Sequence, residues 1–170
     1  MGIISRFPAG ATKPYIEEIY NSDGQLISAN MHGYEAVRDN AFSNCSSLVL
    51  ITLPSGITNI GNSSFAGCTS LALTTLPSGI TSIGNSAFVD CSSLALTSLP
   101  SGITNIGDYA FAGCSSLVSL TFEGTPENIG ANAFTGCNNL TTINVPWAEG
   151  AVANAPWGAE NATINYGHTG

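Results

Sequence analysis

The sequence is poor in charge, and positive charge is almost missing. Its formal net charge is −8, from eleven acidic side chains and three basic ones, Arg6, Lys13 and Arg38. A nucleic-acid-binding protein needs clustered Lys and Arg to neutralise phosphates, and anionic membrane surfaces attract the same residues. The composition therefore argues against both partners. Between Asp39 and Asp108 the only charged residue is Asp90, so hydroxyls, amides and carbonyls should dominate the surface there.

Long apolar segments are missing as well. No apolar run approaches the ~20 residues of a membrane-spanning helix, so membrane insertion is not expected. Residues 1–14 also lack the apolar stretch of about 7–15 residues that marks a secretory signal. Three explanations stay open: the chain remains inside the cell, leaves by another route, or was trimmed.

Residues that could perform catalysis are few and scattered. Glu17 and Glu18 are adjacent on a predicted strand, so their side chains point to opposite faces and cannot form a carboxylate pair. His32 and His168 lie in no recognised motif, and His32 is expected to be a partly exposed residue of a terminal cap. There is no glycine-rich phosphate loop followed by a helix and a lysine. The sequence therefore predicts no enzyme activity, no cofactor and no metal site.

What the sequence does contain is a strict repeat of 23 residues. Three columns of residues recur at this step, and a period in the twenties is typical of a solenoid whose successive coils stack on one another. We number the coils one to five by their cysteines. The columns are Cys45, Cys68, Cys91, Cys114 and Cys137; Phe42, Phe65, Phe88, Phe111 and Phe134; and Leu48, Leu71, Leu94, Leu117 and Leu140.

The cysteine column is predicted to be buried and reduced. Stacking places equivalent residues about 5 Å apart with parallel Cβ vectors, which disfavours disulfides, and an odd number of cysteines cannot pair completely. Buried thiols then act as small hydrophobic side chains. A reactive or metal-binding set of thiols is the alternative.

Each coil is predicted to contain a tight corner and a strand. Within a coil, Phe65, Cys68 and Leu71 are three residues apart, the spacing of one face of a 3₁₀ turn. The residue before each cysteine tolerates a left-handed backbone, so a positive φ is expected at Asn44, Gly67, Asp90, Gly113 and Gly136. The stretch after each corner, such as ALTTLP at 72–77, alternates like a parallel strand and ends at proline. The isoleucines after the Ser-Gly turn, such as Ile80 and Ile83, lead the chain back along the far wall.

The two ends depart from the repeat, as caps must. Residues 15–20 and 25–30 flank Asn-Ser-Asp-Gly and predict a hairpin, and residues 1–36 form an N-terminal cap with a partial coil. The repeats fill 37–145, and 146–170 form a C-terminal cap whose last strand, ATINY at 162–166, repeats TTINV at 141–145. Trp147 and Trp157 are expected to cover the last coil, with ligand stacking as the alternative.

The string LPSGITSIGNSAFVDCSSL at 76–94 resembles the bacterial leucine-rich repeats called BspA-like, or Treponema-type. Five corners carry the pattern Ile-Gly-x-x-Ala-Phe-x-x-Cys-x-x-Leu or a close relative, over roughly residues 27–145. The resemblance implies a β-rich member of the α/β class, a right-handed leucine-rich-repeat solenoid with about five coils, a parallel sheet on the concave face and short 3₁₀ corners on the other side. Thr74, Thr97 and Arg38 depart from the pattern. The segment 143–166 is more distantly similar to the ends of repeat proteins from gut bacteria and their prophages.

Strand alternation predicts which side chains face outward from the sheet. Two neighbouring columns form the candidate contact surface: Leu50, Leu73, Leu96, Ser119 and Thr142, and beside them Thr52, Thr75, Ser98, Thr121 and Asn144. If alternation holds, three leucines form an exposed ridge, which would mark a contact surface. The alternative is a bulge in coils two and three that buries Leu73 and Leu96 and turns Thr74 and Thr97 outward.

The resemblance implies an interaction role, often adhesion, at bacterial or parasite cell surfaces. We therefore expect a non-catalytic module that recognises a protein or a glycan through the concave sheet. A structural component of a prophage particle or surface appendage is the alternative. Association of two copies through a solenoid end or a sheet edge also stays open.

Overall fold

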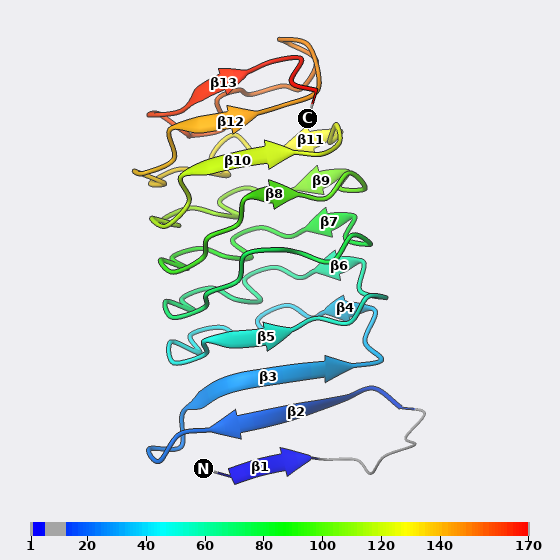
Figure 1. The fold of residues 1–170 in the computed structure, drawn as a ribbon, viewed down its shortest axis with the longest axis vertical. Coiled ribbons are helices and arrows are strands. Elements are labelled where there is room, and N and C mark those ends of the chain that lie inside the picture. Colours follow the sequence, from blue (N-terminus) through cyan, green and yellow to red (C-terminus); the bar gives the residue numbers. More distant parts are fainter. Residues whose placement is uncertain (1, 6–12, 170) are drawn as a thin grey trace.

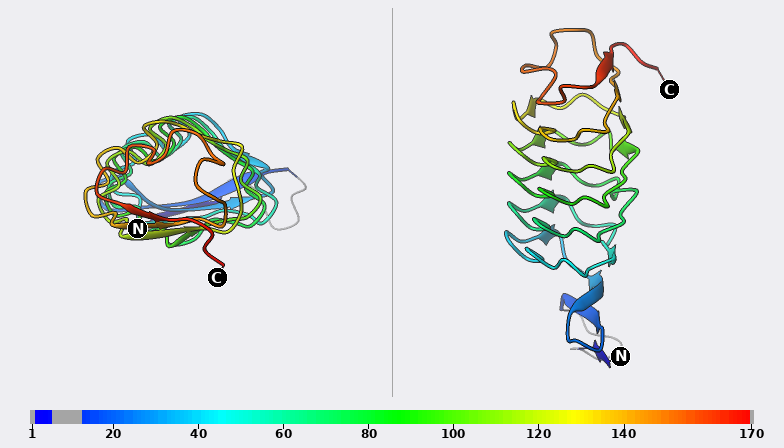
Figure 2. Two further views of the ribbon diagram at one scale, coloured as in Figure 1. Left: turned by 90° about the horizontal axis from the view of Figure 1, so that it is seen from above. Right: turned by 90° about the vertical axis from the view of Figure 1, so that its left-hand side faces the viewer.

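The computed structural model describes residues 2–5 and 13–169; Arg6 and most of the 1–14 segment lie outside this part. The chain forms a column of stacked coils, with the N-terminus at one end and the C-terminus near the other (Figure 1). Seen along the column, the coils superimpose on one closed outline (Figure 2). No helix occurs among the described residues. The predicted solenoid is confirmed, and its walls are sheets of short strands.

The N-terminal cap is the predicted hairpin with one further strand. Strand β2 (Tyr15–Tyr20) pairs antiparallel with β3 (Leu26–His32), and β1 (Gly2–Ser5) pairs with the other edge of β2. Strand β3 then pairs in parallel with the first strand of the repeats, with Ala29 opposite Ile51. The hairpin thus supplies the hydrogen-bonding edge on which the solenoid begins.

One side of each coil, here called the first wall, contains the predicted strands. After β3 these are β5 (Leu50–Thr52), β8 (Ser98–Leu99), β10 (Ser119–Phe122), β12 (Thr142–Asn144) and β13 (Thr163–Asn165). They belong to two sheets, ordered β1-β2-β3-β5 and β8-β10-β12-β13. Residues 72–77 of coil two form no strand. The expected continuous sheet is therefore interrupted at coil two.

The opposite side, the second wall, is also a parallel sheet. It contains β4 (Ala36–Val37), β6 (Asn59–Ile60), β7 (Ser82–Ile83), β9 (Asn105–Ile106) and β11 (Asn128–Ile129), paired in that order. Val37 lies opposite Ile60, and Ile60 opposite Ile83. The sequence placed these isoleucines on the far wall but did not predict that they form strands.

The corners are successive turns instead of the 3₁₀ helices expected. In coil two the N–H groups of Ala66 and Cys68 donate to the carbonyls of Ser63 and Phe65, as in a 3₁₀ turn. A positive φ at Ser63 and at Gly67 interrupts the helical path. The predicted positive φ before each cysteine is confirmed in all five coils, at Asn44, Gly67, Asp90, Gly113 and Gly136. The first four corners each contain two left-handed residues, and their N–H groups donate to the next coil as well as within the corner.

The core consists of aligned columns. The five phenylalanine rings stack along the solenoid with centroids 5.2–5.5 Å apart and interplanar angles of 3–5°. Cys68, Cys91, Cys114 and Cys137 are buried, Cys45 is half-buried, and none forms a disulfide. The predicted column of reduced thiols is confirmed.

Two tryptophans close the C-terminal end of this core. Trp157 is fully buried and Trp147 nearly so. Both rings contact the ring of Phe122, at centroid distances of 6.2 and 5.2 Å. The indole N–H of Trp157 donates to the carbonyl of Ala153. The structure therefore confirms the predicted covering role of both tryptophans.

Candidate functional site

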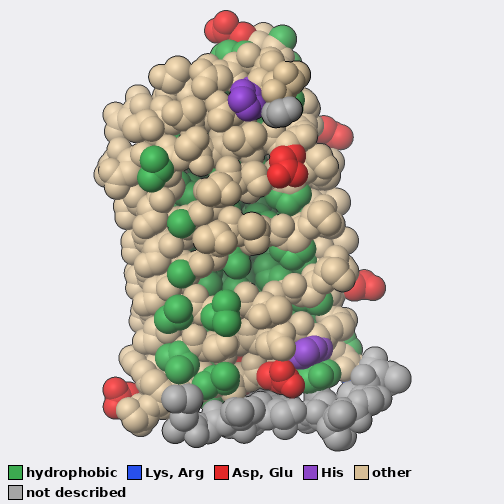
Figure 3. Space-filling model, in the orientation of Figure 1, with side chains coloured by type: hydrophobic (Ala, Val, Ile, Leu, Met, Phe, Trp, Pro, Cys, Tyr) green, Lys and Arg blue, Asp and Glu red, His purple; other side chains and the backbone are tan. Residues whose placement is uncertain are grey.

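The first wall is the candidate binding face. Figure 3 shows it with a few acidic side chains, most of them near its edges, and no described Lys or Arg side chain in view. Its middle, formed by residues 72–77 and 95–100, consists of hydroxyl and aliphatic side chains. A partner on this surface would therefore meet dipoles and apolar groups instead of fixed charges.

The predicted contact residues separate into accessible and inaccessible positions. Leu50 is 57% exposed, whereas Leu96 is 2% exposed and belongs to the core. Leu73 is half-buried, and Thr74 and Thr97 are exposed. The predicted ridge of three exposed leucines is therefore wrong, and the alternative bulge describes coils two and three. The remaining predicted residues are exposed or half-buried: Thr52, Thr75, Ser98, Ser119, Thr121, Thr142 and Asn144.

The bulge follows from the threonines at positions 74 and 97. Coil four has Leu120, which is buried, at the equivalent position. Burying a leucine stabilises a fold by about 1.5–3 kcal/mol, while burying an unpaired hydroxyl is unfavourable. The chain therefore rotates so that Leu96 occupies the core and Thr97 faces solvent.

The rotation leaves a displacement in the main-chain register. The Ala72 N–H donates to the Val49 carbonyl, one repeat earlier, but the Ala95 N–H donates to Leu73 instead of Ala72. The next step is regular, because Thr121 lies opposite Ser98 and Phe122 opposite Leu99, each 23 residues apart. Coil two thus lies between two registers and cannot complete a regular ladder.

This mismatch opens a hollow on the first wall between β5 and residues 73–77. Its volume is about 350 Å³, and its lining includes Ile51, Thr52, Leu53, Leu73, Thr75 and Leu76. Figure 3 shows hydrophobic side chains at the bottom of a depression in this part of the face. The hollow joins predicted contact residues of two coils, Thr52 with Leu73 and Thr75.

Further along the wall, side-chain amides form a ladder across three coils. The Nδ2 of Asn144 donates to Oγ1 of Thr121, and the Nδ2 of Asn165 donates to Oδ1 of Asn144. These bonds hold the predicted contact residues Thr121 and Asn144 in fixed orientations. Asn165 was not predicted as a contact residue, although its alignment with Asn144 was visible in the repeat of TIN.

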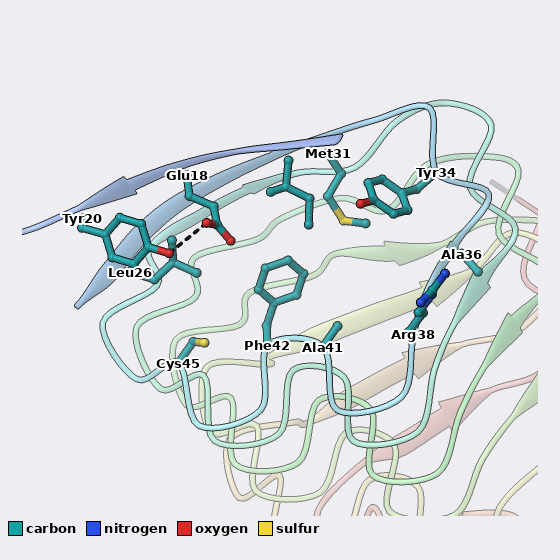
Figure 4. A pocket seen from close by; sticks show the side chains of 11 residues that line it. Glu18, Tyr20, Leu26, Met31, Tyr34, Ala36, Arg38, Ala41, Phe42 and Cys45 are labelled. Carbon is teal, nitrogen blue, oxygen red and sulfur yellow. Dashed lines mark hydrogen bonds between the residues drawn. The ribbon is translucent and has the colours of Figure 1, made fainter. Parts of the chain in front are cut away.

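A second hollow lies at the N-terminal end of the solenoid, where the hairpin faces the first corner (Figure 4). It has a volume of about 480 Å³, and Ile16, Leu26, Met31 and Phe42 supply apolar lining. Glu18 accepts a hydrogen bond from the hydroxyl of Tyr20 at 2.8 Å, and Arg38 lies on the opposite side. This hollow was not predicted from the sequence, because residues of the hairpin and of the first corner form it together. None of the predicted contact residues lines it.

The acidic pair of the hairpin is divided as expected. Glu18 faces the second hollow, while Oε2 of Glu17 accepts a hydrogen bond from Nδ2 of Asn30 and lies 3.2 Å from Nε2 of His32. The ring of His32 stacks on that of Tyr15 at 4.4 Å. His32 is about one-third exposed, which confirms its predicted place as a partly exposed cap residue.

The thiols are poorly suited to nucleophilic chemistry. Burial, followed by the charge of the neighbouring thiol, raises the pKa of Cys68 and of Cys91 to about 12. Burial raises the pKa of Cys137 to about 11 and that of Cys114 well above its ordinary value. Thiols are nucleophilic as thiolates, so these four are unreactive at neutral pH.

Within residues 2–5 and 13–169, no three His, Cys, Asp or Glu side chains gather as a metal site would require. In the same part of the chain, no helix has the length and apolarity needed to span a membrane.

Comparisons with known proteins agree with the repeat architecture. Residues 35–151 match the family described as BspA type leucine rich repeat region, in six copies. No curated protein matches the chain.

Solved structures of bacterial leucine-rich repeat proteins resemble this solenoid. A leucine-rich repeat protein from Bacteroides ovatus shares 31% identity and a TM-score of 0.61, over 70% of this chain and 31% of its own. A leucine rich cell surface protein from Faecalibacterium prausnitzii shares 24% identity and a TM-score of 0.67, over 91% and 41%. The leucine-rich repeat protein of T. pallidum shares 20% identity and a TM-score of 0.56, over 88% and 95%. The present chain thus spans less than half of the first two proteins.

Proposed function

The chain belongs to the BspA-type leucine-rich repeat family, and we propose that it is a non-catalytic module that binds a protein or a glycan through its first wall. The observation that carries the proposal is the row of uncharged, accessible side chains along this wall. Thr52, Thr75 and Ser119 are exposed beside the 57% exposed Leu50. Such mixed polar and apolar surfaces on rigid stacked repeats provide extended contact areas.

The uncharged side chains of this surface predict how its affinity for the partner depends on salt. Interactions between fixed charges weaken as salt rises, because ions screen them. Contacts from hydroxyls, main-chain groups and leucine side chains do not depend on that screening. Affinity for the partner should therefore change little between about 0.05 M and about 0.5 M NaCl.

The test uses charged, bulky side chains on the wall. Purified protein is applied to arrays of glycans and of host proteins, and the Thr75→Arg/Ser98→Arg variant is applied in parallel. We expect this variant to lose capture. Its circular dichroism and melting temperature should stay unchanged, because Thr75 is exposed and Ser98 is only half-buried. A matched control, Asn59→Arg/Asn128→Arg, places the same charges on exposed residues of the second wall. The assignment is contradicted if the first-wall variant still captures the partner, or if the second-wall control loses capture to the same extent.

We also propose display at a cell surface, on the ground that the relative from F. prausnitzii is described as a cell surface protein. Intact cells that produce the full natural protein would be treated with an external protease. Loss of the protein, with a cytoplasmic marker left intact, supports the proposal. Full protection of the protein contradicts it.

A further inference from the structure

We propose that the hollow between β5 and residues 73–77 binds an extended, uncharged segment of a partner polypeptide through main-chain hydrogen bonds and one apolar side chain. This inference rests on the proposed function of the first wall and narrows its partner from protein or glycan to a peptide strand. Three observations carry it: unpaired main-chain groups, an aliphatic floor, and the lack of side chains that suit sugars or charged groups.

Over the length of the hollow the main-chain N–H groups of coil two are unused, while the Leu73 carbonyl accepts from the Ala95 N–H of the next coil. The last hydrogen bond between coils one and two on this wall joins Ala72 to Val49, and the next one joins Thr81 to Thr58 on the second wall. Among the described residues, the N–H groups of residues 73–76 donate to no protein acceptor. By contrast, β10 pairs with strands on both its sides.

Unpaired main-chain groups beside a strand are the feature that peptide-binding sheets use. A strand added to an open edge gains affinity from main-chain hydrogen bonds and specificity from pockets for alternate side chains. Here β5 has a partner on one edge alone, β3. Thr74 and Thr75 are both exposed, so coil two is not pleated at this point. Residues 73–77 therefore do not pair with the open edge of β5.

The floor of the hollow can hold an apolar side chain. Ile51 and Leu76 are 3% and 9% exposed, and Leu73 and Leu53 are packed against the core at their sides. Thr52 and Thr75 bring hydroxyls to the rim. Alternate side chains of an extended peptide are about 7 Å apart, so a peptide seated here would place one side chain in the hollow and its neighbours outside it.

The same lining disfavours glycans and charged ligands. It contains no aromatic ring, carboxylate or side-chain amide, which are the groups that pack on sugar rings and pair with several sugar hydroxyls. A charged side chain would lose hydration without gaining a partner, because residues 40–89 contain no charged residue. An uncharged peptide needs no sugar-binding side chains and has no charged group to dehydrate.

The test uses a phage-displayed library of random peptides of about twelve residues as its probe. The critical variant is Leu73→Ser/Thr74→Leu, which gives coil two the residues that coil four has at Ser119 and Leu120. Because Leu120 is buried and Ser119 lies in a regular strand, this variant is expected to pair coil two with β5 and to fill the hollow without loss of stability. Asn59→Ala, at an exposed residue of the second wall, is the control.

We expect the native protein to enrich uncharged peptides with one central apolar residue. Their affinity, measured by fluorescence polarisation, should fall by about tenfold or more for the Leu73→Ser/Thr74→Leu variant and stay within about twofold for Asn59→Ala. N-methylation of alternate peptide nitrogens should cause a similar loss, since it removes main-chain donors.

Three results would overturn the inference: no enriched peptide, equal affinity for the native protein and the Leu73→Ser/Thr74→Leu variant, or full tolerance of N-methylation. Glycan capture that Thr75→Arg/Ser98→Arg abolishes, with no peptide binding, would overturn the peptide assignment while leaving the proposed function of the wall intact. If the native protein captured no peptide, protein or glycan through its first wall, the peptide assignment and the proposed function of the wall would both be wrong.

Discussion

The thiol of Cys91 donates a hydrogen bond to the main-chain carbonyl of Phe65 in the preceding coil, at an Sγ–O distance of 3.0 Å. The same bond recurs from Cys68 to Phe42, from Cys114 to Phe88 and from Cys137 to Phe111. The cysteine column therefore does more than fill space, because these four thiols each join their coil to a main-chain carbonyl of the phenylalanine column in the preceding coil. Cysteine suits this buried position because its side chain is small and apolar, and its S–H group can still donate a hydrogen bond.

Replacing Cys91 by alanine should lower the free energy of unfolding by about 1–2 kcal/mol, from the lost hydrogen bond and the small cavity. Cys45→Ala is the matched control, because Cys45 lies in the first corner, is half-buried and donates to no described acceptor. Its cost should stay below about 0.5 kcal/mol. Urea unfolding measures both, and equal losses would show that the inter-coil bond contributes nothing.

Stability should fall at high pH because of the thiols. The pKa of Cys91 is about 12 in the fold, against an ordinary value of 9.0. Between these values the unfolded chain loses its thiol proton while the folded chain keeps it, so stability is complete below pH 9 and declines as pH rises toward 12. Urea midpoints measured from pH 8 to pH 11 should show this decline, and Cys91→Ala should make it shallower. An unchanged slope in that variant would contradict the assignment to Cys91.

Gly84 follows Ile83 in the repeat pattern and lies against the coil below. A Cβ added there would stand 2.7 Å from the main-chain nitrogen of Asn62 and 2.8 Å from the carbonyl carbon of Gly61. These main-chain atoms cannot move without separating the coils, so Gly84→Ala should cost about 1–3 kcal/mol. Gly56→Ala, where a Cβ would meet nothing within 4 Å, should be nearly neutral. Melting temperatures of the two variants measure the difference, and comparable values would refute the close-approach explanation.

Trp157 should be the main support of the C-terminal end. Trp157→Ala removes a fully buried ring and its hydrogen bond to Ala153, and the expected loss is about 3–5 kcal/mol. Trp157→Phe keeps most of the apolar contact and should cost less than half as much. Calorimetry of both variants, with near-ultraviolet circular dichroism to follow the packing of Trp147, tests this. A loss near zero for Trp157→Ala would mean that the last coil does not depend on its cover.

The columns were predictable because a strict repeat leaves little freedom. Phe65 and Phe88 share the same local sequence, so they adopt the same local structure and stack when the coils are in register. The hairpin was predictable from Asn21 to Gly24, and the left-handed backbone at Asp90 from its place in a column otherwise occupied by Gly and Asn. Each of these conclusions needed local residues alone.

The candidate site was predictable only in outline. Leu50 and Leu73 occupy equivalent positions, and yet the first is exposed and the second half-buried. The difference depends on whether Ile51 or Thr74 follows, and on how far the adjacent coils shift their hydrogen bonds in response. The N-terminal hollow was not predictable, because Glu18 of the hairpin and Phe42 of the first corner line it together only after the two elements have packed.

The order of the residues alone determined that this protein is a stack of similar coils with capped ends, since every coil repeats one set of buried side chains. The tertiary structure decided where the stack departs from regularity. At coil two the gain from burying leucine opposes the gain from main-chain pairing, and the balance depends on neighbours 23 residues away on both sides. A hollow with free main-chain groups is the outcome of that competition, and no single coil could have revealed it.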